Sequence, residues 1–206
     1  YESPLLGIHA SVPNWQEAGR AIYAWLAARS EIDAGRIGIV GASFGSFYGT
    51  VAGAAEPRHA LIAASGTCLE PGCHTIFDEA SPTFKKRYMF MAGYDDEARF
   101  DAFMKSLTLD GIAETVKQPY FIIAGEADEL SPLEFADRQF KAMSAPRQLV
   151  VYQDSRHSVG GVPSTILGPS PAALLAEWVA ARFAGRPFKS ERWYVDAAGH
   201  IAKTAL

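Results

Sequence analysis

A serine between two glycines is the pattern in the 206-residue chain that most strongly suggests chemistry. The run Gly41 to Gly45 reads Gly-Ala-Ser-Phe-Gly, with Ser43 at its centre. A short apolar stretch, Arg36–Val40, predicts a buried strand before it, and the small residues of Phe44–Ala55 predict a helix after it. We therefore expect a sharp strand-to-helix turn that exposes the serine hydroxyl, with both glycines avoiding clashes that a Cβ would cause.

The same turn predicts a site for negative charge. The N-terminal end of the predicted helix carries partial positive charge and would point at the serine. The backbone N–H of Phe44 then becomes a candidate oxyanion-hole donor for a tetrahedral intermediate. The alternative is an ordinary serine in a glycine turn, which the strand and helix on either side disfavour.

A serine hydroxyl needs a base, and His157 is the candidate. It lies in a polar loop, Asp-Ser-Arg-His, after the predicted strand Gln148–Tyr152. In serine hydrolases with this type of turn, the chain order is serine, acid, histidine. His200 lies beyond the last predicted helix, and the other histidines precede the expected acid: His9, His59 and His74. A histidine on a surface loop with no such role is the alternative.

The acid should follow the preceding strand, where three carboxylates stand in the run Gly-Glu-Ala-Asp-Glu-Leu-Ser-Pro. Asp128 is the candidate, because a short carboxylate a few residues beyond the strand end is the usual geometry. Glu126 and Glu129 remain open as alternatives. Asp154 is a weaker rival, since it lies too close to His157 in sequence. A Ser43–His157–Asp128 triad would cleave an acyl bond through an acyl-enzyme without a cofactor.

One cluster of two cysteines and a histidine is a candidate metal site. Cys68, Cys73 and His74 do not have a standard zinc spacing, and no fourth ligand is evident. We therefore expect no metal there, and a disulfide or two pocket thiols instead.

Strands and helices alternate along the rest of the chain. Such alternation predicts an α/β fold, a parallel sheet with helices on both faces. Ser131 is the expected cap of the helix that follows the acid loop. The remaining predicted elements are helices 13–29, 132–143 and 171–183, strands 60–64 and 119–124, and a hairpin within 192–201.

More than fifty residues separate Ala64 from Pro119, where a crossover helix needs only about a dozen. Helical segments near 83–91 and 96–107, rich in aromatic residues and methionine, suggest a lid over a pocket. The expected division is therefore a hydrolase core from 1–66 and 118–190, a helical cap from 67–117 and a tail hairpin from 191–206.

These motifs together resemble the α/β-hydrolase superfamily. Within it, the segments Ser81–Met91 and Asp128–Glu134 are similar to the group that contains 2,6-dihydroxypseudooxynicotine hydrolase and fungal polyketide-shortening hydrolases. The resemblance implies the α/β-hydrolase fold, a helical cap and, for that group, cleavage of a carbon–carbon bond beside a carbonyl. It also implies strands before the helix at Pro13, which supply a second oxyanion N–H. We therefore expect this sequence to lack its N-terminal strands.

Composition narrows the functional classes. The net charge of −4 and the absence of a basic run disfavour nucleic acid and anionic membrane surfaces as partners. Two cysteines and no stretch of membrane-spanning length favour a cytoplasmic protein. The expected partner is a small-molecule substrate with an apolar part, and a homodimer stays open.

Three functions remain in competition. The first is a serine hydrolase of esters or thioesters, and the second is a carbon–carbon bond hydrolase of β-diketone-like substrates. The third is a non-catalytic, truncated hydrolase domain that binds a partner or ligand.

Overall fold

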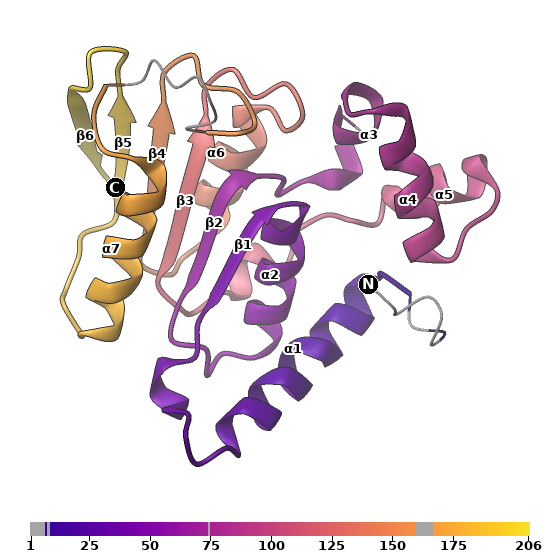
Figure 1. Ribbon diagram of the computed structural model, residues 1–206, viewed down its shortest axis with the longest axis horizontal. Helices are drawn as coiled ribbons and strands as arrows, with labels where there is room; N and C mark the ends of the chain where they lie inside the picture. Colours follow the sequence, from indigo (N-terminus) through magenta and orange to yellow (C-terminus); the bar gives the residue numbers. More distant parts are fainter. Residues whose placement is uncertain (1–6, 8, 74, 160–166) are drawn as a thin grey trace.

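The computed structural model describes residues 7, 9–73, 75–159 and 167–206, and its centre is a six-stranded sheet. The strands lie side by side in chain order, which Figure 1 shows from β1 beside α2 to β6 at the C-terminus. The first five strands are parallel and β6 is antiparallel to β5. Their bounds are β1 Ile39–Ser43, β2 Ile62–Thr67, β3 Tyr120–Gly125, β4 Arg147–Tyr152, β5 Glu191–Val195 and β6 Ile201–Ala205.

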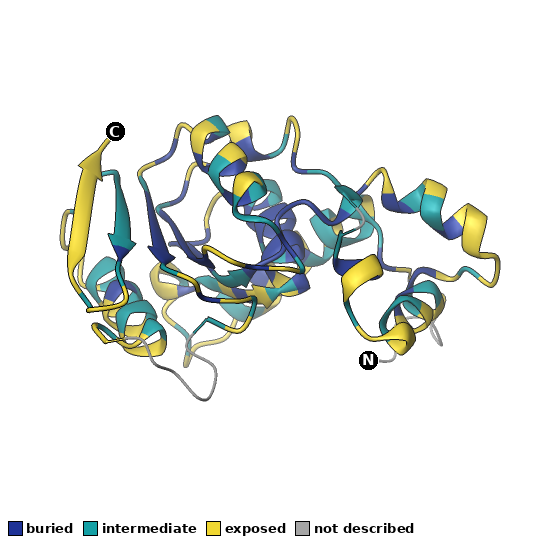
Figure 2. Cartoon of the chain, turned by 90° about the horizontal axis from the view of Figure 1, so that it is seen from above, coloured by how far each residue is buried: buried dark blue, intermediate teal, exposed yellow. Residues whose placement is uncertain are grey.

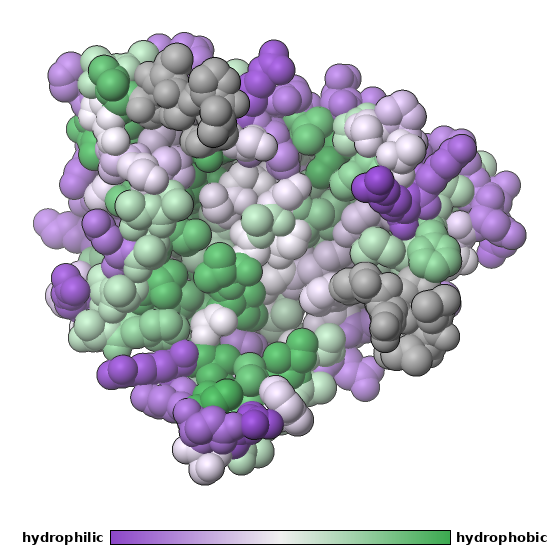
Figure 3. All heavy atoms as spheres, in the orientation of Figure 1, coloured by the Kyte–Doolittle hydropathy of each residue, from purple (hydrophilic) through white to green (hydrophobic). Residues whose placement is uncertain are grey.

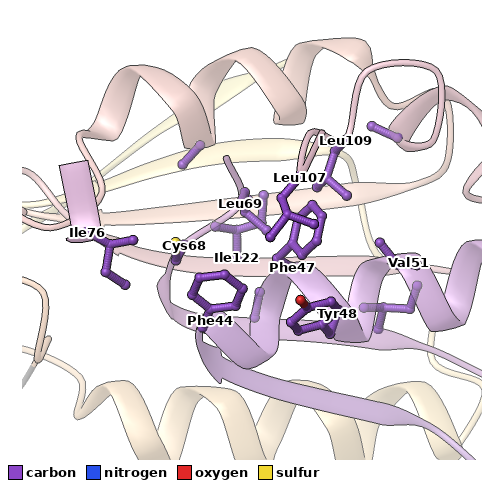
Figure 4. Packing of buried hydrophobic residues seen from close by; sticks show 14 of the residues in the cluster. Phe44, Phe47, Tyr48, Val51, Cys68, Leu69, Ile76, Leu107, Leu109 and Ile122 are labelled. Atoms are coloured by element: carbon purple, nitrogen blue, oxygen red, sulfur yellow. The ribbon is translucent and has the colours of Figure 1, made fainter. Parts of the chain in front are cut away.

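Helices cover both faces of the sheet. Successive side chains of a strand point to opposite faces, so one strand contributes apolar side chains to the packing on both sides. On β3, Tyr120 and Ile122 belong to one apolar cluster, whereas Phe121 and Ile123 belong to another. The first cluster packs under α2 (Phe44–Ala55) and α6 (Leu133–Ala142), and the second under α7 (Pro171–Phe183). Figure 4 shows aromatic side chains of α2 in one cluster with Ile122. The expected α/β architecture is confirmed.

Helix α1 (Val12–Ala27) packs against α2 at very close range. A Cβ on Gly19 would lie 2.7 Å from the carbonyl oxygen of Ala52, so the two backbones nearly touch. The hydroxyl of Ser11 caps the helix by accepting a hydrogen bond from the backbone N–H of Asn14. The outer face of α1 leaves Ile22 and Trp25 exposed.

Two local expectations were wrong. The strand before Ser43 begins at Ile39 and not at Arg36, because Asp33 accepts a hydrogen bond from the N–H of Gly35 and starts a short 3-10 helix, Ala34–Arg36. That strand also runs into the serine itself, so the bend is confined to one residue. Ser131 does not cap α6; its backbone N–H instead donates to Asp128.

The tail forms the expected hairpin, but it is also part of the main sheet. Strand β5 pairs with β4 over five residues, and β6 covers the outer edge of β5. The turn between them contains Gly199, whose φ of 85° suits glycine. Figure 2 shows the contrast between the dark blue inner strands and the yellow, exposed β6.

The segment between β2 and β3 forms short helices beside the sheet, of which α3, α4 and α5 lie together at the right of Figure 1. Its interior is aromatic: Phe77, Tyr88 and Phe100 are buried, and most of the neighbouring rings are in contact with one another. The helices are η3 Pro71–Cys73, α3 Thr75–Glu79, α4 Pro82–Ala92, α5 Glu97–Met104 and η4 Ala113–Thr115. Many of the large apolar side chains of this insert therefore belong to the core.

Candidate active site

Ser43 occupies a strained turn between β1 and α2. Its φ of 50° and ψ of −129° are unusual for a residue with a side chain, and the pairing of β1 with β2 shifts register at the same point. A Cβ at Gly41 would lie 2.3 Å from the carbonyl oxygen of Gly45, so Gly41 is needed for the turn as expected. The same expectation for Gly45 was wrong, because a Cβ there meets no atom within 4 Å outside its own helix turn.

The turn places the serine hydroxyl against the predicted base. Ser43 Oγ lies 2.7 Å from His157 Nε2. The other ring nitrogen, Nδ1, faces a carboxylate, which can only accept a hydrogen bond when ionised. The ring proton therefore belongs on Nδ1, and Nε2 is free to accept the hydrogen bond that the serine hydroxyl donates.

Asp128 is the carboxylate that faces the ring. His157 Nδ1 lies 2.9 Å from its Oδ2 and 3.0 Å from its Oδ1. Oδ1 also accepts hydrogen bonds from the backbone N–H groups of Leu130 and Ser131, both at 2.9 Å. The side chain is only 1% exposed. These backbone donors fix the carboxylate and compensate for its loss of hydration.

The other candidate acids lie around the histidine loop without facing its ring nitrogens. Glu126 accepts hydrogen bonds from the N–H of Asp154 at 3.1 Å and from the hydroxyl of Tyr194 at 3.0 Å. Glu129 accepts from the backbone N–H of His157 at 3.4 Å. Asp154 itself has a φ of 52° at the loop bend. The structure thus brings together Ser43, His157 and Asp128, and it leaves Glu126, Glu129 and Asp154 in supporting positions.

Two glycines that the sequence analysis did not single out make room for the histidine loop. Gly66, at the end of β2, has a φ of 54°, and a Cβ there would lie 2.7 Å from the carbonyl oxygen of His157. A Cβ on Gly125 would lie 2.2 Å from the carbonyl oxygen of Ser155. Their signal is position alone: each stands near the C-terminal end of a parallel strand, where loops from different strands meet.

Aromatic side chains from the insert pack directly on the residue after the serine. The ring centroid of Phe44 lies 4.1 Å from that of Tyr88 and 5.8 Å from that of Phe77. All three side chains are buried. The side chain of Phe44 is therefore packed against aromatic rings that belong to the insert.

An open apolar groove of about 420 Å³ runs beside the serine turn, between β1, α1 and α2. Figure 3 shows hydrophobic side chains gathered on this face between α7 and α1. Val40, on the outer edge of β1, is 58% exposed. Gly41, Ala42 and Gly45 line the groove but Ser43 does not, so it lies next to the hydroxyl and not around it.

The two cysteines are free thiols in this structure. Burial raises the pKa of the Cys68 thiol well above its ordinary value, which keeps it protonated. His74, the third member of the candidate metal cluster, lies outside the described residues. Within the described ranges, no group of three metal-ligating side chains comes together.

Comparison with solved structures identifies the fold. A crystal structure of 2,6-dihydroxy-pseudo-oxynicotine hydrolase matches with a TM-score of 0.77 and 22% identity, over 92% of this chain and 52% of its own. Acetyl xylan esterase 1 from Thermoanaerobacterium sp. matches with a TM-score of 0.59 and 16% identity, over 82% and 52%. Acylaminoacyl peptidase of Pyrococcus horikoshii matches with a TM-score of 0.56 and 18% identity, over 73% and 25%. The chain thus spans about half the length of the first two structures, and no match was found among curated protein sequences.

The class of the protein follows from this likeness and from the sheet and turn described above: the chain has the α/β-hydrolase fold. The model of the prolyl oligopeptidase family matches residues 20–186, most of the chain. The chain belongs to the prolyl oligopeptidase family. The solved structures named above are those of a hydrolase, an esterase and a peptidase.

Proposed function

We propose that this chain carries the catalytic triad of a serine hydrolase that cleaves an acyl bond, an ester or a thioester. Ser43 is the nucleophile, His157 the base and Asp128 the acid. One observation carries the proposal: a continuous hydrogen-bonded path joins Ser43 Oγ to His157 at 2.7 Å and His157 to Asp128 at 2.9 Å. Such a path is the geometry that activates a serine hydroxyl.

Acylation follows from these contacts. As Ser43 Oγ attacks the acyl carbon, His157 Nε2 takes the hydroxyl proton and the ring becomes positively charged. Asp128 stabilises that charge and holds the ring in place through Nδ1. The carbonyl oxygen becomes an oxyanion, for which the N–H of Phe44 at the start of α2 is the proposed donor. When the tetrahedral intermediate collapses, Nε2 protonates the departing alcohol or thiol.

Deacylation uses the same groups in reverse. A water molecule replaces the leaving group, gives a proton to Nε2 and attacks the acyl-enzyme. The second tetrahedral intermediate releases the acid and returns the proton to Ser43 Oγ. No metal or organic cofactor enters either step.

The substrate we propose is a small molecule with an apolar part. The open groove beside the serine turn supports it, because its lining includes apolar side chains such as Trp15, Val40 and Tyr88, and an apolar groove favours an apolar group. Two structural neighbours are an acetyl xylan esterase and an acylaminoacyl peptidase, which supports acyl chemistry for this site as well.

Labelling by a fluorophosphonate probe tests the triad directly, since the probe reacts with activated serines. We expect the chain to be labelled, and Ser43→Ala and His157→Ala to abolish labelling. Glu126→Gln is the matched control for the loop carboxylates and should still be labelled. Labelling that survives Ser43→Ala would refute the proposal. A folded chain that is not labelled would favour the non-catalytic alternative.

The carbon–carbon bond hydrolase remains the second candidate, supported by the 0.77 TM-score to 2,6-dihydroxy-pseudo-oxynicotine hydrolase. Parallel assays of p-nitrophenyl esters and β-diketones separate the two candidates. Both reactions would use Ser43, but the first cleaves an acyl bond and the second a carbon–carbon bond. Turnover of esters without any turnover of diketones would favour the first candidate.

Location and assembly stay predictions. No helix in the described parts of the chain is both long and apolar enough to cross a membrane. The cytoplasm is the proposed compartment, and the two free cysteines support it. The homodimer that the sequence leaves open is tested by measuring the mass of the protein in solution.

A further inference from the structure

Ser46 has an unusual pair of contacts next to the proposed nucleophile. It is the third residue of α2 and is only 1% exposed. Its Oγ donates a hydrogen bond to the carbonyl oxygen of Ser43 at 2.6 Å and accepts one from the backbone N–H of Cys68 at 2.9 Å. The hydroxyl thus ties the strained turn to the chain just beyond β2.

These contacts leave the Ser46 hydroxyl only one arrangement. Its oxygen accepts from Cys68, so its single proton must go to the carbonyl of Ser43. The Ser43 carbonyl is therefore held by a side chain that is itself fixed by the segment just beyond β2, and not by the backbone of the helix alone.

The Ser43 carbonyl and the Phe44 N–H belong to one peptide unit. That unit is planar and trans, so the C=O and the N–H point in opposite directions and turn together. Holding the carbonyl oxygen of Ser43 therefore also fixes the direction of the Phe44 N–H. This N–H is the proposed oxyanion donor. How much it stabilises the transition state depends on whether it points at the oxygen on which negative charge develops.

We propose that Ser46 is a positioning residue, which aims the Phe44 N–H at the oxyanion through the Ser43 peptide. The inference rests on the proposed function and goes beyond it. Ser46 touches no substrate in this scheme. It acts by preventing the peptide from rotating within a turn whose backbone is already strained at φ 50°.

Ser46→Ala removes the anchor, and Thr50→Ala is the matched control. Thr50 lies one turn further along α2, is fully buried, and bonds both the carbonyl of Ser46 and the hydroxyl of Tyr120. Both variants lose a buried hydroxyl of the same helix, so both should lose stability. Only Ser46→Ala frees the Ser43 peptide.

Two quantities, kcat and the inhibition constant of an oxyanion-forming inhibitor, separate a positioning role from a loss of stability when they are measured on folded protein. For a p-nitrophenyl ester, Ser46→Ala should lower kcat about 10- to 100-fold with little change in KM. The inhibition constant of a matching trifluoromethyl ketone, whose serine adduct carries an oxyanion, should rise by a similar factor. Thr50→Ala should leave both quantities near the wild-type values, and Ser46→Thr, which keeps the hydroxyl, should restore most of kcat.

The outcomes distinguish this inference from the proposed function. If fluorophosphonate does not label the wild-type chain, the proposed function fails and the role of Ser46 fails with it. If the wild type is labelled and Ser46→Ala keeps kcat and ketone affinity, or changes them only as much as Thr50→Ala does, Ser46 has no positioning role and the proposed function stands.

Discussion

The two ends of helix α2 differ in whether a side chain forms hydrogen bonds with their backbone groups. At the N-terminal end, Ser43 stands in the capping position, yet its side chain makes no capping hydrogen bond because it faces His157. At the C-terminal end, the side-chain amide of Gln118 donates to the carbonyl oxygens of Gly53 at 2.7 Å and Glu56 at 3.0 Å. One end leaves backbone groups open, and the other satisfies them with a buried side chain.

The difference separates chemistry from stability within one helix. The first N–H groups of a helix have no partner inside it, so an uncapped start keeps them available for an anion. Carbonyls at a buried helix end gain nothing from being open and cost free energy if unpaired. We therefore expect changes at the first end to alter rate more than stability, and changes at the second end to do the reverse.

The largest effect should come from replacing Ser43 by glycine. Loss of the nucleophile should lower kcat by about 10⁶-fold. Glycine adopts a φ of 50° without strain, so Ser43→Gly should also be more stable than Ser43→Ala by about 1 kcal/mol.

Urea unfolding of the two variants measures this difference, and Ser43→Ala is the control because it lacks the hydroxyl but keeps a Cβ. Equal stability of the two variants would mean that the turn stores no strain.

The acid gives the next largest effect. Asp128→Asn keeps the shape but favours the wrong tautomer of His157, so kcat should fall by about 10⁴-fold. Glu126→Gln, in the same loop, should lower kcat less than about 10-fold, since the described hydrogen bonds of its carboxylate go to the backbone of Asp154 and the hydroxyl of Tyr194 and not to the ring of His157. The reverse ranking in an esterase assay would make Glu126 the acid.

Local pattern was enough to predict much of the fold. The bounds of α2 and α7 match the expected helices. Pro171 suits the first position of α7, and Pro57 disfavours a helix that continues beyond α2. Strand β1 was misplaced by three residues at its start, since the turn closed by Asp33 competes with an apolar strand pattern. The hairpin was foreseen, but not its pairing with β4, because sequence spacing does not determine strand partners.

The site divides in the same way. Ser43, His157 and Asp128 stand at positions that a strand-to-loop pattern marks, so sequence singles them out and the structure brings them together. Ser46 and Gly66 could not be assigned, because their contacts join segments more than twenty residues apart. The sequence alone does not show which residues at the ends of neighbouring strands contact one another.

The closed end of α2 offers the third prediction. Gln118→Ala takes one donor from each of two buried carbonyls, those of Gly53 and Glu56, which keep hydrogen bonds from the backbone N–H groups of Glu56 and His59. The loss of the two side-chain hydrogen bonds should cost about 2–3 kcal/mol of unfolding free energy. The rate per folded molecule should stay within about 2-fold of wild type, because the change lies at the end of α2 opposite Ser43. Lys117→Ala, at the exposed neighbouring position, should change stability by less than about 0.5 kcal/mol. A kinetic defect in Gln118→Ala larger than its stability loss would contradict the separation of the two ends.

The smallest effect concerns Glu56, which follows α2, and it depends on pH. A side-chain hydrogen bond from the exposed guanidinium of Arg58 lowers the pKa of Glu56 to about 2, from 4.5. Because the folded pKa is depressed, this carboxylate stabilises the fold above about pH 4.5, and the contribution is lost as the pH falls toward 2.

Glu56→Gln should therefore cost about 1–2 kcal/mol at pH 7, a modest figure because Arg58 is largely in water. The deficit relative to wild type should shrink when urea unfolding is repeated at pH 3. Glu134→Gln removes an exposed carboxylate of α6 and should show little deficit at either pH. A deficit for Glu56→Gln that is the same at both pH values would mean that shape and packing hold this end of α2, and not the charge of the carboxylate.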